Sequence, residues 1–138
     1  MSERERAEIK RVISSIFEAA RNKDFEKLEE LNSWDEGYTK FSDLPPFERL
    51  EGDSARHFDI VLFTNITDFS CLIEDLKIQT YGDCAVATCY LNYGGIFVND
   101  YNFEAKRFTQ RSRATFVLVK KRGKWVVVHE HLSQFVQN

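Results

Sequence analysis

The sequence predicts an α+β fold in which three N-terminal helices pack on a strongly curved antiparallel sheet. Three observations carry this prediction. Apolar residues recur at three- and four-residue steps up to about residue 64, alternation dominates after Asp68, and glycine-containing turns separate the later segments at 82–83 and 121–123. Helices followed by a run of strands are typical of the α+β class. At 138 residues the chain is expected to form a single domain, 1–138.

The helices are predicted from their caps and apolar stripes. The first is expected over residues 2–21, with Ser2 as its N-cap and Glu5 completing a capping box. Asp24 is expected to cap a second short helix, and Gly52-Asp53 to begin a third over about 54–64. The first helix has the clearest stripe, formed by Ile9, Val12, Ile13, Ile16, Phe17 and Ala20.

Four long strands are predicted after the helices, at 70–81, 84–93, 105–120 and 124–136. Residues 94–104, which contain Gly94-Gly95 and Asn99-Asp100, are interpreted as an excursion or a bulged hairpin. Strands of this length do not suit a small flat sheet. A curved sheet wrapped around the first helix would accommodate them and close a cone with one open mouth.

The loop predicted at 33–52 is unusually aromatic, and Pro45-Pro46 exclude a continuous helix through it. Exposed loops rarely carry so many rings, so the segment is expected to fold over something apolar. It could act as a lid across the mouth of a cavity, or it could pack directly on the core. Its aromatic residues are Trp34, Tyr38, Phe41 and Phe47.

Charge and cysteine content limit the class of protein. A net charge of −3 argues against a nucleic-acid-binding protein, although residues 105–124 are basic and contain no acid. That stretch fits either a solvated hairpin or a site for an anionic small molecule. Three cysteines without paired spacing indicate reduced thiols. With no apolar signal core and no membrane-length apolar run, we expect a cytoplasmic protein without a membrane partner.

The last predicted strand carries His129, His131 and Ser133 at alternate positions. Regular alternation would place these side chains on one face together with Trp125 and Val127. Such a row could line a pocket, hold a metal or lie at a subunit interface. A metal is not expected, because zinc catalysis usually needs three protein ligands and only two imidazoles are in place.

The opposite face of the same strand offers a different site. It would present Glu130 among Val126, Val128 and Leu132. If this face were the inner one, Glu130 would be desolvated and its pKa would rise, while the histidines would lie outside at a dimer seam. The sequence leaves both alternatives open.

The order of three helices and a strand meander resembles the nuclear transport factor 2-like superfamily, the cystatin-like α+β roll. The closing motif is similar to its SnoaL-like branch and to the association domain of calcium/calmodulin-dependent kinase II. This motif comprises Arg113-Ala114-Thr115, the turn Gly123-Lys124-Trp125, and Val128-His129-Glu130-His131-Leu132-Ser133. The resemblance implies a conical pocket between the sheet and the first helix, and a homodimer packed through the sheet.

The function expected from these observations is binding of a small, partly apolar molecule, either neutral or anionic. Whether the protein is an enzyme stays open, and no cofactor is expected. The alternative is a non-catalytic homo-oligomerisation module. Arg113 is a candidate for holding an anionic group, and Tyr38 for donating a hydrogen bond to an oxyanion. The candidate pocket residues are Arg113, His129, His131, Glu130, Trp34 and Tyr38.

Overall fold

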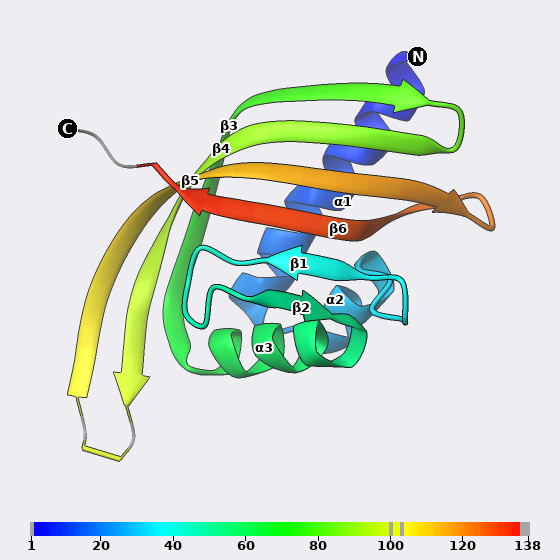
Figure 1. Cartoon of the computed structure of the whole chain (residues 1–138). Coiled ribbons are helices and arrows are strands. Elements are labelled where there is room, and N and C mark those ends of the chain that lie inside the picture. The colour runs from blue at the N-terminus through cyan, green and yellow to red at the C-terminus, as the bar shows by residue number, and fades with distance from the viewer. Residues whose placement is uncertain (1, 100, 103, 136–138) are drawn as a thin grey trace.

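A computed structural model describes residues 2–99, 101–102 and 104–135. Three helices and six strands occur in the order α1, α2, β1, β2, α3, β3, β4, β5, β6 (Figure 1). Their bounds are α1 Glu3–Asn22, α2 Phe25–Leu31, β1 Thr39–Phe41, β2 Arg49–Glu51, α3 Gly52–Thr64, β3 Ile66–Tyr81, β4 Cys84–Asn99, β5 Glu104–Lys121 and β6 Lys124–Gln134.

The three predicted helices are confirmed, and their caps explain their ends. The Ser2 side chain accepts a hydrogen bond from the backbone N–H of Glu5, and Asp24 accepts one from Lys27. Helix α1 ends at Asn22 because Lys23 adopts a left-handed conformation. None of the helices in the described residues combines the length and apolar character needed to cross a bilayer.

The sheet is mixed, which corrects the prediction of an antiparallel sheet. Its order is β2-β1-β6-β5-β4-β3, and β1 runs parallel to β6 while all other neighbours are antiparallel. Both additional strands come from the segment 33–52 that was predicted to be a loop. They are only three residues long, and each is too short to show an alternating pattern.

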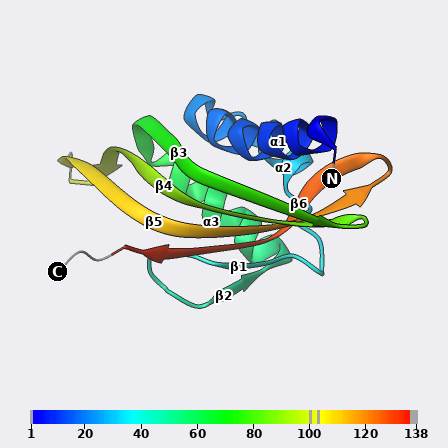
Figure 2. The same cartoon turned by 90° about the horizontal axis from the view of Figure 1, so that it is seen from above.

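The sheet has one face covered by helix and one that is not. Helix α1 lies across one side of strands β3–β6 (Figure 2), and we call this side the inner face. The inner-facing residues of β4 are buried, whereas the alternate residues Val86, Thr88 and Tyr90 belong to the outer face and are partly or fully exposed. The core between α1 and the inner face is apolar and includes Ile9, Ile13, Leu28, Ala87, Leu91, Phe116, Leu118 and Val127.

Gly94-Gly95 lie within β4 and do not start the predicted excursion. A Cβ on Gly94 would lie 2.5 Å from the carbonyl oxygen of Phe108, and one on Gly95 would lie 2.7 Å from the side chain of Ile66. The paired strands therefore approach too closely here for any side chain. Strand β4 continues to Asn99, and β4 and β5 curve away from the body beyond the glycines (Figure 1). Asp100, part of the predicted turn, lies outside the described residues.

A β-bulge at Val128 corrects the predicted face of the last strand. Val117 pairs with His129, but the next residue of β5, Leu118, pairs with Val127, so Val128 is an extra residue. The bulge reverses the alternation. Trp125 and Val127 are buried before it, and Glu130 and Leu132 are buried after it. The histidines therefore do not share a face with Trp125 and Val127; residue 136, the predicted end of this strand, lies outside the described residues.

Replacing Gly94 with Ala is expected to lower the free energy of unfolding by about 1–3 kcal/mol, the usual cost of forced overpacking. The cause is the backbone oxygen of Phe108, which cannot move without disturbing the β4–β5 pairing. Urea unfolding measures the effect. Gly37→Ala is the control, because its Cβ would make only an ordinary contact at 3.6 Å. Equal stability of the two variants would contradict this account of the bend.

Candidate functional site

The candidate site is a small internal chamber between α1, α3, the inner face of the sheet and the segment that follows β1. Its volume is about 30 Å³. Most of its lining is apolar, and its charged groups are Lys40, Asp43 and Glu130. Polar groups converging in an apolar cavity are typical of ligand sites. The apolar lining consists of Phe17, Leu44, Leu62, Phe63, Ile66, Phe69, Leu91 and Leu132, joined by the ring of Tyr93.

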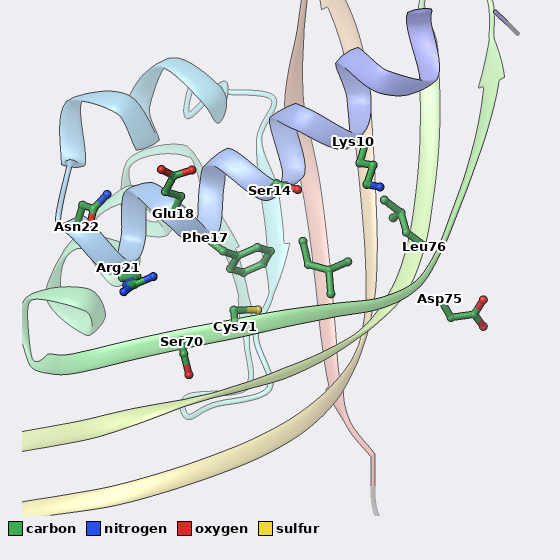
Figure 3. A pocket seen from close by; sticks show the side chains of 11 residues that line it. Lys10, Ser14, Phe17, Glu18, Arg21, Asn22, Ser70, Cys71, Asp75 and Leu76 are labelled. Atoms are coloured by element: carbon green, nitrogen blue, oxygen red, sulfur yellow. The ribbon is translucent and has the colours of Figure 1, made fainter. Parts of the chain in front are cut away.

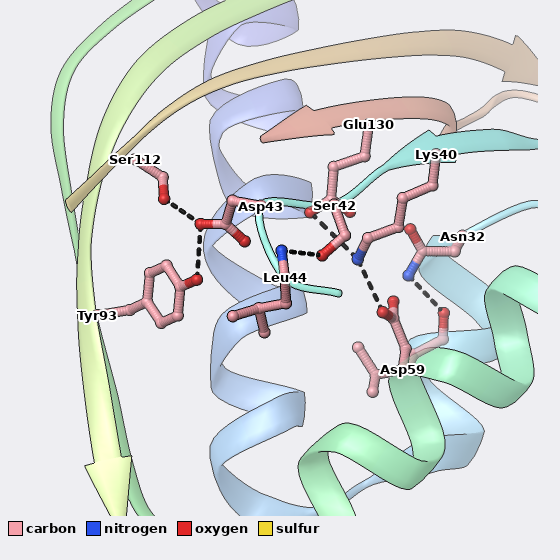
Figure 4. A network of polar contacts seen from close by, with 10 residues as sticks. Asn32, Lys40, Ser42, Asp43, Leu44, Asp59, Tyr93, Ser112 and Glu130 are labelled. Carbon is pink, nitrogen blue, oxygen red and sulfur yellow. Dashed lines mark hydrogen bonds and ion pairs between the residues drawn. The ribbon is translucent and has the colours of Figure 1, made fainter. Parts of the chain in front are cut away.

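A buried ion cluster forms one wall of the chamber (Figure 4). The ammonium nitrogen Nζ of Lys40, on β1, lies 2.7 Å from Oδ1 of Asp59 on α3 and 3.6 Å from Oε1 of Glu130 on β6. All three side chains are at most 6% exposed. Buried charges are tolerated only when they are paired, so this cluster fixes the three elements relative to one another.

Burial changes the acid–base properties of this cluster. Burial raises the pKa of Glu130 to about 7; the Lys40 ammonium opposes this shift, and Asp59 and Asp43 add to it. Burial alone would lower the pKa of Lys40, but Asp59 and Glu130 raise it above the ordinary lysine range. Lys40 therefore stays cationic near neutral pH, whereas Glu130 can gain or lose a proton there.

Asp43 forms a second polar network on the opposite side of the chamber (Figure 4). Its Oδ2 accepts hydrogen bonds from the Tyr93 hydroxyl at 2.7 Å, from Nε2 of Gln110 at 2.6 Å, and from the Ser112 hydroxyl. Its other oxygen, Oδ1, is buried and has no hydrogen-bond partner among the described residues. Asp43 is only 3% exposed, so this oxygen is an unfilled acceptor in an apolar cavity.

Three of the sequence-predicted site residues lie on the inner side of the sheet. Glu130 lines the chamber. Tyr38 is fully buried, and burial together with the charges on Glu130 and Asp59 raises its pKa. Trp34 is half-buried and packs edge-on against Tyr38, with ring centroids 6.5 Å apart. These two rings pack on the core and do not line the chamber, so this part of the segment behaves as packing and not as a lid.

The other three predicted residues lie on the outer face. His131 is exposed and packs against the ring of Phe41, and His129 is half-buried with its Nδ1 2.7 Å from the Thr39 hydroxyl. Burial, helped by the charge on His131, lowers the pKa of His129. Arg113 is exposed, and its Nε donates to the Ser133 hydroxyl at 3.1 Å. The structure therefore does not bring these residues together with Glu130.

Several charged residues in and beside the chamber were not identified from the sequence. Lys40 sits between Thr39 and Phe41 in a strand whose charged residue points inward and whose aromatic residue is 37% exposed, the reverse of the usual pattern. Asp43 follows in the same segment, and Asp59 is a buried carboxylate on α3. The only available signal was the aromatic loading of 33–52, which indicated packing over an apolar space.

A wider cleft of about 950 Å³ lies between α1 and the edge strand β3 (Figure 3). Phe17 lines both this cleft and the chamber. Lys10 and Arg21 border it as exposed side chains, and Cys71 is half-buried within it. Burial raises the pKa of Cys71 to about 12, so its thiol is a poor nucleophile near neutral pH. The cleft lacks the convergent buried polar groups of the chamber.

Replacing Glu130 with Gln is expected to flatten the pH dependence of stability between about pH 4.5 and 7. The pKa of Glu130 in the folded protein, about 7, exceeds the ordinary value of 4.5, so ionising this carboxyl costs the folded state free energy as the pH rises. The wild type should therefore lose up to about 3 kcal/mol relative to the variant across this window.

Urea unfolding of both proteins at pH 5 and pH 7.5 measures the difference. The groups that act on Glu130 are Lys40, Asp59 and Asp43, and all remain in the variant. Glu36→Gln is the control because Glu36 is exposed. A wild type that gains stability relative to Glu130→Gln as the pH rises would refute the assigned sign.

Similar folds occur in proteins of different descriptions. A candidate dehydratase of the nuclear transport factor 2-like family from Streptomyces avermitilis superposes with a TM-score of 0.83 at 19% identity, covering 99% of this chain and 100% of that chain. The association domain of calcium/calmodulin-dependent kinase II from C. elegans gives 0.72 at 25% identity, with coverages of 96% and 97%. A cystatin-like protein from Caulobacter vibrioides gives 0.75 at 18% identity, with coverages of 94% and 89%.

No curated protein matches the sequence. The family model described as a SnoaL-like domain matches residues 9–137, nearly the whole chain. The resemblance inferred from the closing motif and the predicted α+β roll are thereby confirmed, and the chain belongs to the SnoaL-like domain family.

Proposed function

We propose that the protein binds a small, partly apolar molecule in the chamber. The observation that carries this proposal is Oδ1 of Asp43, a buried acceptor without a partner among the described residues. Leaving such a group unsatisfied costs about 1–3 kcal/mol. A ligand that donates a hydrogen bond to Oδ1 and packs against the apolar lining would recover this cost. The proposal assigns binding and leaves any turnover open.

The side chain of Leu44 controls the size of the chamber. At about 30 Å³ the chamber holds a polar headgroup but not a whole metabolite. Leu44 lines it, is only half-buried, and belongs to the segment between β1 and β2 (Figure 4). Movement of Leu44 would extend the chamber toward solvent without disturbing the sheet. We therefore place the ligand's apolar part where Leu44 now packs.

The charges of the chamber do not favour the anionic ligand considered from the sequence. Lys40 is already bound to Asp59, and the chamber also holds the carboxyl groups of Asp43 and Glu130. Arg113, the residue considered for an anionic group, lies on the outer face and contacts Ser133. We therefore propose a small, partly apolar ligand that carries no negative charge.

Leu44→Ala is expected to increase affinity for benzyl alcohol, a small donor with an apolar ring, by about tenfold or more, because the shortened side chain enlarges the chamber. Chemical shifts in protein NMR spectra during titration measure the affinity and locate the ligand. Leu72→Ala is the matched control, since Leu72 is 61% exposed on the outer face. No binding to Leu44→Ala, or shifts away from the chamber, would contradict the proposal.

A homo-oligomerisation module is the second candidate function, and the outer face of the sheet supports it. This face carries valines that are only half-buried by their own chain, an apolar patch suited to an interface. The neighbouring folds include association domains of calcium/calmodulin-dependent kinase II. We propose that the protein is a homodimer packed through this patch, formed by Val86, Val117, Val119 and Val126.

Val117→Lys is expected to convert the proposed dimer to a monomer, since a buried unpaired charge at an interface costs several kcal/mol. Size-exclusion chromatography with light scattering measures the mass. Val61→Lys is the control, because Val61 is 45% exposed on α3, away from the outer face. A monomeric wild type, or equal masses for wild type and Val117→Lys, would refute the interface.

A further inference from the structure

We infer that the ligand of the chamber is an organic cation whose ammonium group pairs with Asp43. This inference rests on the proposed binding function and specifies the chemistry of the ligand. It comes from the imbalance of charge in the chamber, the identity of the groups that donate hydrogen bonds to Asp43, and the aromatic rings that line the same chamber.

Asp43 lacks a cationic partner within the described part of the chain. Its Oδ2 is held by the Tyr93 hydroxyl at 2.7 Å, the Gln110 amide at 2.6 Å and the Ser112 hydroxyl, all of which are neutral donors. Burying a carboxylate with neutral donors alone is costly, and a paired cation offsets that cost. Oδ1, the oxygen without a partner, is where such a cation would bind.

Lys40 does not supply this charge. Its Nζ lies 2.7 Å from Asp59 and 3.6 Å from Glu130, and it forms no ion pair with Asp43 among the described residues, although the charge of Asp43 helps to raise the pKa of Lys40. One ammonium thus faces the carboxyl groups of Asp59 and Glu130, and Asp43 adds a third carboxyl group. The described chamber therefore has a deficit of positive charge that a cationic ligand would correct.

Aromatic rings line the chamber together with Asp43 and also favour a cation. The rings of Phe63 and Phe69 pack edge to face with centroids 5.3 Å apart, and those of Phe69 and Tyr93 lie 6.3 Å apart. Both phenylalanines and Tyr93 line the chamber with Asp43. The negative face of an aromatic ring attracts an ammonium group, and the attraction grows in a desolvated site. An anionic headgroup would meet repulsion from the same walls.

The size of the chamber suits an ammonium headgroup. A volume of about 30 Å³ holds a group comparable to one or two water molecules. A primary ammonium fits this space, while the carbon skeleton attached to it would occupy the position of the Leu44 side chain. The predicted ligand class is therefore a small primary amine with an aromatic or aliphatic body.

Three probes that differ only in their headgroup test this inference: benzylamine, benzyl alcohol and benzoate. Titration at pH 7.5, followed by protein NMR, is carried out on wild type and on Leu44→Ala, which has room for the ring. Benzylamine is expected to bind at least about tenfold more tightly than benzyl alcohol, and benzoate to bind most weakly. Asp43 is unchanged in both of these proteins, so the comparison does not depend on whether an Asp43 variant folds.

Asp43→Asn in the Leu44→Ala background provides the second arm. It is expected to weaken benzylamine binding by about tenfold or more and to weaken benzyl alcohol binding less, since Asn removes the charge that only the amine pairs with, together with one acceptor oxygen that both probes use. Asp75→Asn is the charge-matched control, because Asp75 is exposed on β3 and outside the chamber. It should leave benzylamine affinity unchanged.

The outcomes separate this inference from the proposed function. Equal affinities for the amine and the alcohol, or tighter binding of benzoate, would overturn the cationic ligand while leaving a functional pocket. Failure of all three probes to bind Leu44→Ala would overturn the pocket itself. A loss of benzylamine binding in Asp75→Asn but not in Asp43→Asn would indicate that the amine binds in the cleft between α1 and β3. That result would refute the pairing of the ammonium group with Asp43.

Discussion

The contact of Lys40 with Asp59 and Glu130 is the constraint on which the chamber depends. It joins a three-residue strand, a helix and the last long strand. Removing one member of such a cluster would leave a buried charge without a partner, a change that usually costs about 3–5 kcal/mol. Strand β1 pairs with β2 and β6 in the sheet and leads through Ser42 into Asp43 and Leu44. The position of the proposed binding groups therefore depends on this polar contact as well as on strand pairing.

Much of the fold was predictable from the sequence because it depends on local signals. Ser2 and Asp24 cap helices that their apolar stripes also indicate, and the turns at 82–83 and 121–123 separate the long strands. Of the candidate residues named from the sequence, Glu130 is the one that lines the chamber. Lys40 and Asp59 could not be identified because an inward-facing charge is recognisable only once its partner is known, and these partners are 19 residues apart. The bulge at Val128 likewise depends on pairing with β5 and produces no change of pattern that can be recognised in the sequence.

The two faces of the sheet separate the two candidate functions. The inner face, with α1 and α3, encloses the chamber and the acidic network, whereas the outer face presents valines together with Arg113 and His131. Because the strands alternate, a substitution on one face changes the other face little. This separation offers a physical account of how one fold accommodates both pocket proteins and association domains. Neither role has to compromise the packing that supports the other, since both use the same rigid sheet as a support.

The bulge at Val128 has a consequence for how homologous sequences can be compared. A relative that lacked this single extra residue would keep its His-Glu-His segment in the same orientation, because Val127 and His129 already pair with successive residues of β5. A strand that kept the extra residue without bulging would turn the segment over, with imidazoles on the inner side and the carboxylate on the outer side. An alignment that omitted the one-residue gap at Val128 for a relative lacking this residue would therefore match a carboxylate of one protein with an imidazole of the other. Functional inference across this family is therefore sensitive to insertions within the last strand, and residue identity there carries meaning only together with strand register.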